Sequence, residues 1–421
     1  MKILWLKTEL LHPVDKGGKI RTYHLLKQLK SAHHITYLTL DDGSAPAEAA
    51  EQASEYCHEL IRIPHVTREK FSTGFYGELA LNMASSLPYA IRKYKSPAMT
   101  AAIRELVAKN DYDVIICDFL APAVNLPRGL QCPVVLFQHN VEAAIWKRHY
   151  EVQKNTAKRI YLSWQWLKMQ RFEGSICRRV DRVIAVSDAD AETMQKDYRI
   201  EKVYPIPTGV DVEFFRPNAA ATPAPNSLVF TGSMDWLPNE DGINYFNDEI
   251  LPLIKKSIPG VTLTIVGRNP SRKLLELAQR DSSIIVTGRV DDVRPYMERA
   301  AAYIVPLRIG GGTRLKIYEA MAMEKPTIST TVGAEGLPLR DGVELLLAND
   351  PRAFADAVLK VLTDANFAAQ LSKNAAQLVR QNFGWDRVSA IMAELCEAVV
   401  VDRQTAGLRA SRLHVTNSAL P

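Results

Sequence analysis

The sequence predicts an α/β protein with two doubly wound, parallel sheets, and three observations lead to this fold class. The chain has 421 residues, which is enough for two domains that each bury a core. Short apolar runs rich in β-branched residues recur along it, and each is followed by a longer segment of helical pattern. These runs lack polar alternation, which is typical of parallel strands covered by helices on both faces.

The predicted strands fall into two groups. The first half contains KILWLK, ITYLTL, LIRI, DVIICD, PVVLFQ and RVIAVS, and the second half contains SLVFTG, VTLTIVG, IIVTG, AAYIVPL, PTIST and ELLLA. Between them, residues 214–227 (FFRPNAAATPAPNS) are rich in Pro, Ala and Asn and have no apolar periodicity, so we expect a linker. We therefore expect Rossmann-like domains at residues 1–213 and 228–384, and a disordered tail at 404–421, which has little to bury.

The composition limits the class of protein. Hydrophobic residues make up 47% and charged residues 24%, as in a soluble globular protein, and the net charge of +5 fits a phosphate-bearing ligand, an anionic membrane or merely solvated surface charge. The five cysteines are scattered and lack CxxC spacing, which disfavours disulfides or a zinc site and favours a reducing cytoplasm. No apolar run approaches the roughly 18 residues of a spanning helix, so any membrane contact is expected at the surface.

Three consecutive glycines in PLRIGGGTRLKIYEA indicate an anion site. Residues 310–312 stand between an apolar strand and a helix, where glycine lets a ligand approach the unpaired N–H groups of the helix start. Arg308, Arg314 and Lys316 add full charges around the same turn. The alternative is a glycine-rich surface turn with incidental cations.

Glu319 lies about two helical turns after these glycines. A carboxylate there would repel phosphate but could accept two hydrogen bonds from a ribose diol; the alternative is a surface Glu paired with a nearby Lys. Phosphate together with ribose indicates a nucleotide. Gly17 and Gly18 open a second helix start, but the loop has no GxGxxG, and Ile20 replaces the Ser or Thr of a Walker loop. Both observations disfavour dinucleotide oxidoreductases and P-loop NTPases.

A basic and aromatic stretch runs from Lys147 to Arg182. It holds ten Lys or Arg residues against three carboxylates, with Tyr161, Trp164 and Trp166 interleaved. Such a surface suits an anionic bilayer, and the alternative is a solvated helix whose aromatic residues pack in the core. We expect no nucleic-acid partner, because no motif or strong charge excess supports one.

Several segments, taken in order, resemble one enzyme family. The N-terminal GG loop is followed by RVDRVIAVSDAD, VYPIPTGVDVEFFRP, VFTGSMDWLPN, LTIVGR, VTGRVDDVRPYMERAAAYIVPL and EAMAMEKPTISTTVGAEGL. Over nearly the whole chain this set resembles the retaining, GT-B-fold glycosyltransferases of family 4, which use nucleotide-activated sugars. Within that family it is similar to bacterial transferases of exopolysaccharide and cell-surface glycan synthesis.

The resemblance implies the architecture and the reaction. It implies two Rossmann-like domains facing a cleft, with a helix at residues 385–403 that crosses over and packs back on the N-terminal domain. It also implies hexosyl transfer with retention from a UDP- or GDP-sugar to a glycan or lipid-linked acceptor, in the cytoplasm or on the inner face of the cell membrane. We expect no cofactor and no metal ion, because no DxD lies in a suitable loop and a helix dipole with Arg and Lys can neutralise the leaving diphosphate.

The resemblance also assigns residues. Glu319 would bind the donor ribose, Arg314 and Leu315 would hold the diphosphate through backbone N–H groups, and residues 288–290 would hold the base. His139 in LFQHNVEAAIW follows an apolar strand, and by resemblance it orients the sugar, although a lone His is often structural. With His139 and Glu319 as the catalytic pair, the predicted donor-binding residues are Gly17, Gly18, Arg268, Gly288, Arg289, Val290, Arg308, Gly311, Gly312, Thr313, Arg314, Leu315, Lys316 and Glu319.

Two departures from the family pattern leave alternatives open. Gly311 stands where the family has the first of two glutamates; Glu335 is a substitute or merely a solvated loop carboxylate. Ser233 and Trp236 stand where an Arg…Lys pair is usual, so Arg308, Arg314, Lys316 and Arg289 are the candidate substitutes. A catalytically silent nucleotide-sugar-binding subunit and a nucleotide-sugar epimerase of similar architecture are the rival interpretations.

Overall fold

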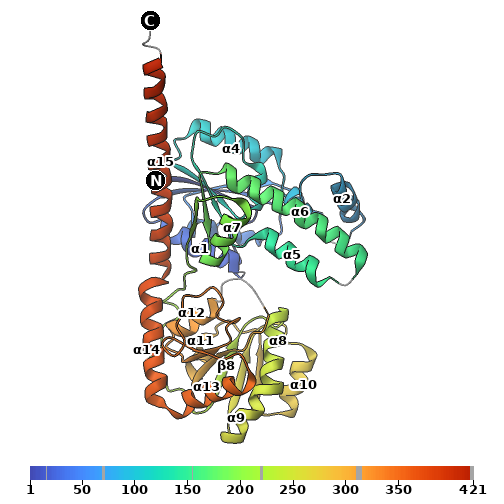
Figure 1. The fold of residues 1–421 in the computed structure, drawn as a ribbon, viewed down its shortest axis with the longest axis vertical. Helices are drawn as coiled ribbons and strands as arrows, with labels where there is room; N and C mark the ends of the chain where they lie inside the picture. Colours follow the sequence, from blue (N-terminus) through green and yellow to red (C-terminus); the bar gives the residue numbers. More distant parts are fainter. Residues whose placement is uncertain (16, 69–71, 154, 219–220, 310–314, 418–421) are drawn as a thin grey trace. The chain divides into compact units, whose positions relative to one another are not determined.

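The computed structural model describes residues 1–15, 17–68, 72–153, 155–218, 221–309 and 315–417. The chain forms two compact units, shown as ribbons in Figure 1. Unit 1 contains residues 1–207 together with the chain from Val388 onward, and unit 2 contains residues 208–387. Each unit is a parallel sheet with helices, so the predicted α/β fold with two doubly wound sheets is confirmed. The described residues of segment 214–226 contain neither helix nor strand.

Unit 1 is built on a parallel sheet, in which seven strands are found among the described residues, in the order β3-β2-β1-β4-β5-β6-β7. The strands are β1 (Lys2–Lys7), β2 (His34–Asp41), β3 (Glu59–Pro64), β4 (Val114–Asp118), β5 (Val134–Phe137), β6 (Arg182–Ala185) and β7 (Val203–Pro205). The first six coincide with predicted runs. The edge strand β7 was not predicted, since it has three residues, two of them exposed, and so leaves no apolar run.

The helices of unit 1 connect these strands. They are α1 (Gly17–Leu29), α2 (Thr73–Met83), α3 (Tyr89–Arg92), α4 (Pro97–Lys109), α5 (Glu142–Val152), α6 (Thr156–Arg179) and α7 (Asp188–Tyr198), with short 3₁₀ turns η1 (Ala47–Ala49), η2 (Gln52–Glu55) and η3 (Ala121–Asn125). The strand order reverses between β1 and β4. In open α/β sheets, ligands bind beyond the carboxyl ends of the strands at such a reversal.

Unit 2 repeats this plan with six parallel strands among its described residues, in the order β10-β9-β8-β11-β12-β13. They are β8 (Ser227–Thr231), β9 (Thr262–Val266), β10 (Ile284–Gly288), β11 (Ala302–Val305), β12 (Thr327–Ser329) and β13 (Leu346–Leu347), and all coincide with predicted runs. The reversal falls between β8 and β11, so the chain segments after these two strands are the expected ligand-binding edge.

The helices of unit 2 surround this sheet. They are α8 (Leu237–Tyr245), which continues through a π-helical stretch η4 (Phe246–Ile250) into α9 (Leu251–Ser257), then α10 (Arg272–Arg280), α11 (Arg294–Arg299), α12 (Leu315–Ala322), α13 (Pro351–Thr363) and α14 (Ala365–Asn382). A single apolar cluster joins the strands to these helices. The helix α12 follows β11 and therefore begins at the expected ligand-binding edge.

The C-terminal helix α15 (Trp385–Asn417) packs on unit 1, as predicted. Arg182 at the start of β6 donates to the Leu395 carbonyl at 3.0 Å and to Asp402 at 3.0 Å, and Arg403 pairs with Asp181 at 2.8 Å. Among its described side chains, the buried apolar ones are Trp385, Val388, Met392, Cys396 and Val399. The helix continues to Asn417, beyond residue 403, where the sequence analysis ended it.

All five cysteines are buried and free. Burial raises the pKa of each thiol, which keeps the cysteines protonated. Among the described residues, no helix combines the length and the apolar character that crossing a membrane requires.

Candidate active site

The centre of the unit 1 site is the carboxylate of Asp118, at the carboxyl end of β4. It is fully buried and accepts four side-chain hydrogen bonds. On Oδ2 the donors are Lys7 Nζ at 2.7 Å, Thr22 Oγ1 at 2.7 Å and Trp5 Nε1 at 3.0 Å, and on Oδ1 the donor is His139 Nε2 at 2.7 Å. Burial alone would raise the pKa of Asp118, but the charge of Lys7 and the hydrogen bonds hold it well below its usual range. Asp118 is therefore a carboxylate.

His139 lies beside Asp118, after β5, at the edge that the sequence predicts. Because Asp118 accepts from its Nε2, this nitrogen carries the proton. Burial lowers the pKa of His139 to about 3 and outweighs the neighbouring Asp118, so the ring is neutral at pH 7. The other nitrogen, Nδ1, is buried and has no hydrogen-bond partner among the described residues. Nδ1 therefore carries a lone pair that points in a fixed direction and can accept one hydrogen bond.

Phe119 and Gly18 form the surroundings of this nitrogen. Phe119 has a φ of 73°, which is rare for an aromatic residue, and its ring stacks on His139 with centroids 3.8 Å apart. A Cβ atom at Gly18, in the first turn of α1, would lie 2.7 Å from Phe119 Cζ and 3.9 Å from His139 Nδ1. A Cβ atom at Gly17 would meet nothing within 4 Å. Only Gly18 is therefore needed for this close packing.

In unit 2, Lys316 brings a positive charge to the carboxyl end of β8. Its Nζ lies 4.2 Å from the centroid of the Phe230 ring and donates to Asn239 Oδ1 at 3.0 Å. A Cβ atom at Gly232 would lie 2.6 Å from the same Nζ, so glycine is needed there to admit the ammonium group. Asn239 is held in turn, because its Nδ2 donates to the Ser233 carbonyl at 2.8 Å.

A second cation approaches the same loop from the end of β9. Arg268 Nε donates to Ser233 Oγ at 2.9 Å, and the Arg268 carbonyl accepts from the backbone N–H of Met234 at 2.9 Å. Asn269 donates to Asp235 at 2.8 Å and ties the two loops together. Lys316 and Arg268 thus lie around the loop in which Ser233 replaces the expected cation.

Glu319 lies on α12 three residues after Lys316 and is half-buried. Burial raises the pKa of its carboxyl group to about 7, and the charge of Lys316 opposes this shift. Glu319 is therefore a carboxyl group that changes its charge near neutral pH. Within the described ranges, no group of three or more His, Cys, Asp and Glu side chains is arranged to hold a metal ion.

The other predicted residues are placed as follows. Arg308 makes a two-pronged ion pair with Asp241, at 2.7 and 3.1 Å, and lies over the Tyr245 ring. Gly288 has a φ of 71°, Arg289 is exposed, Val290 packs against the unit 2 core, and Leu315 is half-buried. Glu335 is exposed. Gly311, Gly312, Thr313 and Arg314 lie outside the described residues, so the predicted diphosphate loop stays a prediction.

Sequence reasoning missed the residues that hold these side chains in place. Asp118, Lys7 and Thr22 position His139 and α1, and Asn239 positions Lys316. One signal was available: Lys7 and Asp118 are charged residues that end two strands, and each directly follows four apolar residues. Charged residues at the ends of neighbouring parallel strands meet at one edge of a sheet.

Fold and sequence together define the class. Two parallel, doubly wound sheets in separate units, with the last helix returning to the first unit, form the GT-B architecture. One family model, described as Glycosyltransferase Family 4, matches residues 16–214, and another, described as Glycosyl transferases group 1, matches residues 225–364. The chain therefore belongs to the group 1, family 4 glycosyltransferases, as its motifs indicated.

The chain is also similar to individual proteins over most of its length. The chain is 20% identical over 403 residues to an uncharacterized 44.6 kDa protein in the cps region of Klebsiella pneumoniae, covering 93% of this chain and 99% of that protein. It is 27% identical over 333 residues to a phosphatidyl-myo-inositol mannosyltransferase of Mycobacterium leprae, covering 75% and 82%. The crystal structure of Anabaena HepE in complex with UDP superposes with a TM-score of 0.66 at 15% identity, covering 94% and 100%.

Proposed function

We propose that this glycosyltransferase transfers a hexose from a UDP- or GDP-sugar to a glycan or lipid-linked acceptor, with retention and without a metal ion, in the synthesis of a surface polysaccharide. The relative in the Klebsiella cps region supports the polysaccharide role, and the UDP complex of HepE supports a nucleotide-diphosphate donor. The observation that carries the proposal is the placement of Lys316, whose ammonium group is fixed at the carboxyl end of β8.

Lys316 would stabilise the leaving group. When the bond between sugar and nucleotide breaks, negative charge develops on the departing diphosphate. Asn239 and the Phe230 ring hold the ammonium group in place before the reaction, so little reorganisation is required. Arg268 approaches the same loop and adds a second positive charge. These fixed charges can do the work of a metal ion, which supports the metal-independent reaction.

Glu319 would bind the donor through its ribose. An ionised carboxylate accepts hydrogen bonds from two neighbouring hydroxyl groups, whereas the protonated form accepts them less well. Because burial raises the pKa of Glu319 to about 7, donor affinity should increase as the pH rises through neutrality. This gives the ribose contact a measurable pH signature.

His139 would orient the sugar rather than attack it. Its proton is committed to Asp118, so its Nδ1 can accept a hydrogen bond from a sugar hydroxyl group. In this role His139 contacts a hydroxyl group, and the anomeric carbon of the sugar is left for attack by the acceptor. Retention requires the acceptor to attack on the face that the diphosphate leaves, and the family resemblance supports this outcome.

The test is nucleotide release from a panel of UDP- and GDP-sugars, with and without EDTA, followed by NMR of the product's anomeric proton. We expect release from one donor class, no loss with EDTA, and a product with the donor's anomeric configuration. Lys316→Gln should lower turnover at least about tenfold, as expected for a lost charge on a leaving group.

Lys325→Gln is the matched control. Lys325 is buried and donates to the carbonyls of Glu298 at 2.8 Å and Ala300 at 3.1 Å, so its loss should lower Tm and leave turnover nearly unchanged. Equal losses of turnover in the two variants would contradict the role of Lys316. Binding without any nucleotide release would show a silent nucleotide-sugar-binding subunit.

A further inference from the structure

The outer face of α6 is unusually apolar. Ile160, Trp164 and Leu167 have exposed fractions between 41% and 63%, and Arg171 continues the same row. Their spacing of four, three and four residues places them on one stripe of the helix. The face of a helix that points away from the core normally carries polar residues. A stripe of three large apolar side chains there therefore indicates a surface that meets something other than water.

The neighbouring helix α2 adds to this surface. Tyr76, Leu81 and Met83 have exposed fractions between 46% and 68%. We call the exposed apolar residues of the two helices together the α2–α6 rim. Single exposed apolar residues are common, whereas Met83, Trp164 and Leu167 line one groove and therefore form a patch.

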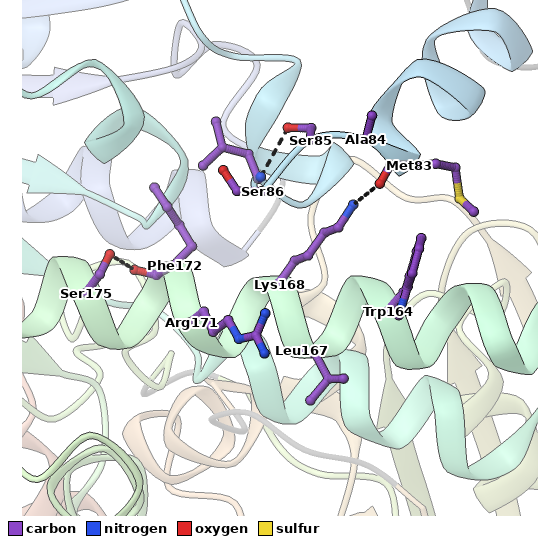
Figure 2. A pocket seen from close by; sticks show the side chains of 11 residues that line it. Met83, Ala84, Ser85, Ser86, Trp164, Leu167, Lys168, Arg171, Phe172 and Ser175 are labelled. Atoms are coloured by element: carbon purple, nitrogen blue, oxygen red, sulfur yellow. Dashed lines mark hydrogen bonds between the residues drawn. The ribbon is translucent and has the colours of Figure 1, made fainter.

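A groove of about 610 Å³ lies between the two sides of the rim. Residues 83–87 form one wall and the face of α6 from Trp164 to Ser175 forms the other, as Figure 2 shows. Its lining is mostly apolar, contains no acidic residue, and includes the cations Lys168 and Arg171. The groove therefore combines apolar surface with positive charge.

The two walls are joined by buried and partly buried hydrogen bonds, so the groove exists before any partner arrives. Lys168 Nζ donates to the Asn82 carbonyl at 2.8 Å, at the end of α2. Gln165 donates to Asn82 Oδ1 at 3.0 Å and accepts from the backbone N–H of Tyr89 at 2.8 Å. Asn82 and Gln165 are both fully buried. A preformed surface loses little entropy when it docks.

The charge on α6 is one-sided. The helix carries six Lys or Arg residues and a single carboxylate, Glu173, which is fully buried and accepts hydrogen bonds from four groups. On α2 the carboxylate of Glu78 is occupied by Arg68 at 3.4 Å and by the Tyr89 hydroxyl. Among the described residues, neither of these carboxylates is paired with Lys168 or Arg171, so a matching partner is anionic as well as apolar.

We propose that the α2–α6 rim docks on an anionic phospholipid bilayer. Trp164, Leu167 and Met83 would enter the interfacial layer, where a partly exposed indole is favoured, and Arg171 would meet the lipid phosphates. This deepens the proposed function and rests on it in one respect, since a lipid-linked acceptor would lie in the same bilayer. The described helices cannot span a membrane, so this contact is one of surface with surface.

The test is co-sedimentation of the full chain with vesicles of phosphatidylcholine alone or of equal amounts of phosphatidylcholine and phosphatidylglycerol. We expect binding to the anionic vesicles, weakened by salt. The double variant W164S/L167S and the single variant Arg171→Glu should each bind at least about tenfold more weakly.

Matched controls separate location from chemistry. Leu275→Ser removes a leucine on α10 that is 42% exposed, against 41% for Leu167, and Arg104→Glu reverses an exposed charge on α4. Both controls should bind as the unchanged protein does. Circular dichroism and Tm confirm that every variant is folded.

Three results would overturn the proposal. The first is binding to neutral vesicles that is as strong as binding to anionic ones. The second is an equal loss of vesicle binding in the rim variants and the control variants. The third is a protein that does not bind vesicles but forms a dimer, which the rim variants convert to a monomer. Nucleotide release from the donor in vesicle-free solution is measured in parallel, and the rim variants should retain it. Release without vesicle binding would reject the docking surface alone, whereas absence of release would reject the proposed function.

Discussion

His139 gives unit 1 a specific acid sensitivity. Its pKa in the folded chain is lowered, first by burial, while the unfolded chain has an ordinary value of about 6.5. Below pH 6.5 the unfolded state therefore takes up a proton that the folded state does not. The stabilising contribution is complete above pH 6.5 and is lost as the pH falls toward the folded pKa of about 3.

The magnitude follows from these two pKa values. Between pH 7 and pH 5, a site that is neutral when folded and titrates at about 6.5 when unfolded lowers the free energy of unfolding by about 2 kcal/mol. The result depends little on the folded pKa, provided that it lies below 5. Replacing His139 by glutamine keeps a donor for Asp118 and removes the titration, so the variant should lack this part of the pH dependence.

The assay is hydrogen exchange of the β4 and β5 amides at the two pH values, corrected for intrinsic rates, in the unchanged protein and in His139→Gln. Other histidines whose pKa is lowered, such as His12 and His33, contribute equally to both proteins and cancel in the difference. An equal decrease of the free energy of unfolding in both proteins would contradict this prediction, because His139 would then be charged in the folded state or solvated.

Three further predictions concern single residues of the two units. Gly18→Ala places a Cβ 2.7 Å from the Phe119 ring, so it should lower the free energy of unfolding in urea by about 1–3 kcal/mol, while Gly17→Ala, whose Cβ meets nothing within 4 Å, should unfold as the unchanged protein does. Glu173→Gln replaces one acceptor oxygen by an NH2 group that faces the donors of Gln138, α5 and Tyr198; it should cost about 3 kcal/mol in urea unfolding, and a neutral result would count against the network. Nucleotide affinity should increase from pH 6 to pH 8 because the pKa of Glu319 is about 7, and a flat profile by calorimetry would contradict this.

The fold could be predicted because the strands are short, apolar and separated by helical patterns. All predicted runs from KILWLK to ELLLA form parallel strands. The strand order reverses between β1 and β4 and between β8 and β11, so the segments after these four strands form the expected ligand-binding edges. The strand β7 could not be predicted, because Val203–Pro205 pairs only at an edge and carries no apolar run. Its pairing with β6 depends on tertiary contact rather than on local pattern.

The candidate site was predictable in its residue types but not in its contacts. His139, Gly18 and Lys316 could be proposed from local patterns, a His after a strand and glycines or cations at a helix start. The hub at Asp118 could not, because its donors Lys7 and Thr22 are 111 and 96 residues away in sequence. Only the sheet order brings them together.

Long-range pairing also changes how the cations are understood. From the sequence, Arg308, Arg289 and Lys316 are equivalent substitutes for the missing Arg…Lys pair. Arg308 is paired with Asp241, 67 residues away, whereas Lys316 is held by Asn239 over the Phe230 ring. The donor-binding role of Arg308 stays a prediction, and Lys316 is the stronger candidate for binding the leaving diphosphate.

The most direct test of the account is calorimetric titration with UDP and GDP of the unchanged protein and of Glu319→Gln. We expect one nucleotide to bind selectively and the variant to bind it at least about tenfold more weakly, because a carboxylate that accepts two ribose hydroxyl groups is replaced by an amide. Equal affinity in the two proteins, or no binding of either nucleotide, would contradict the nucleotide site on α12.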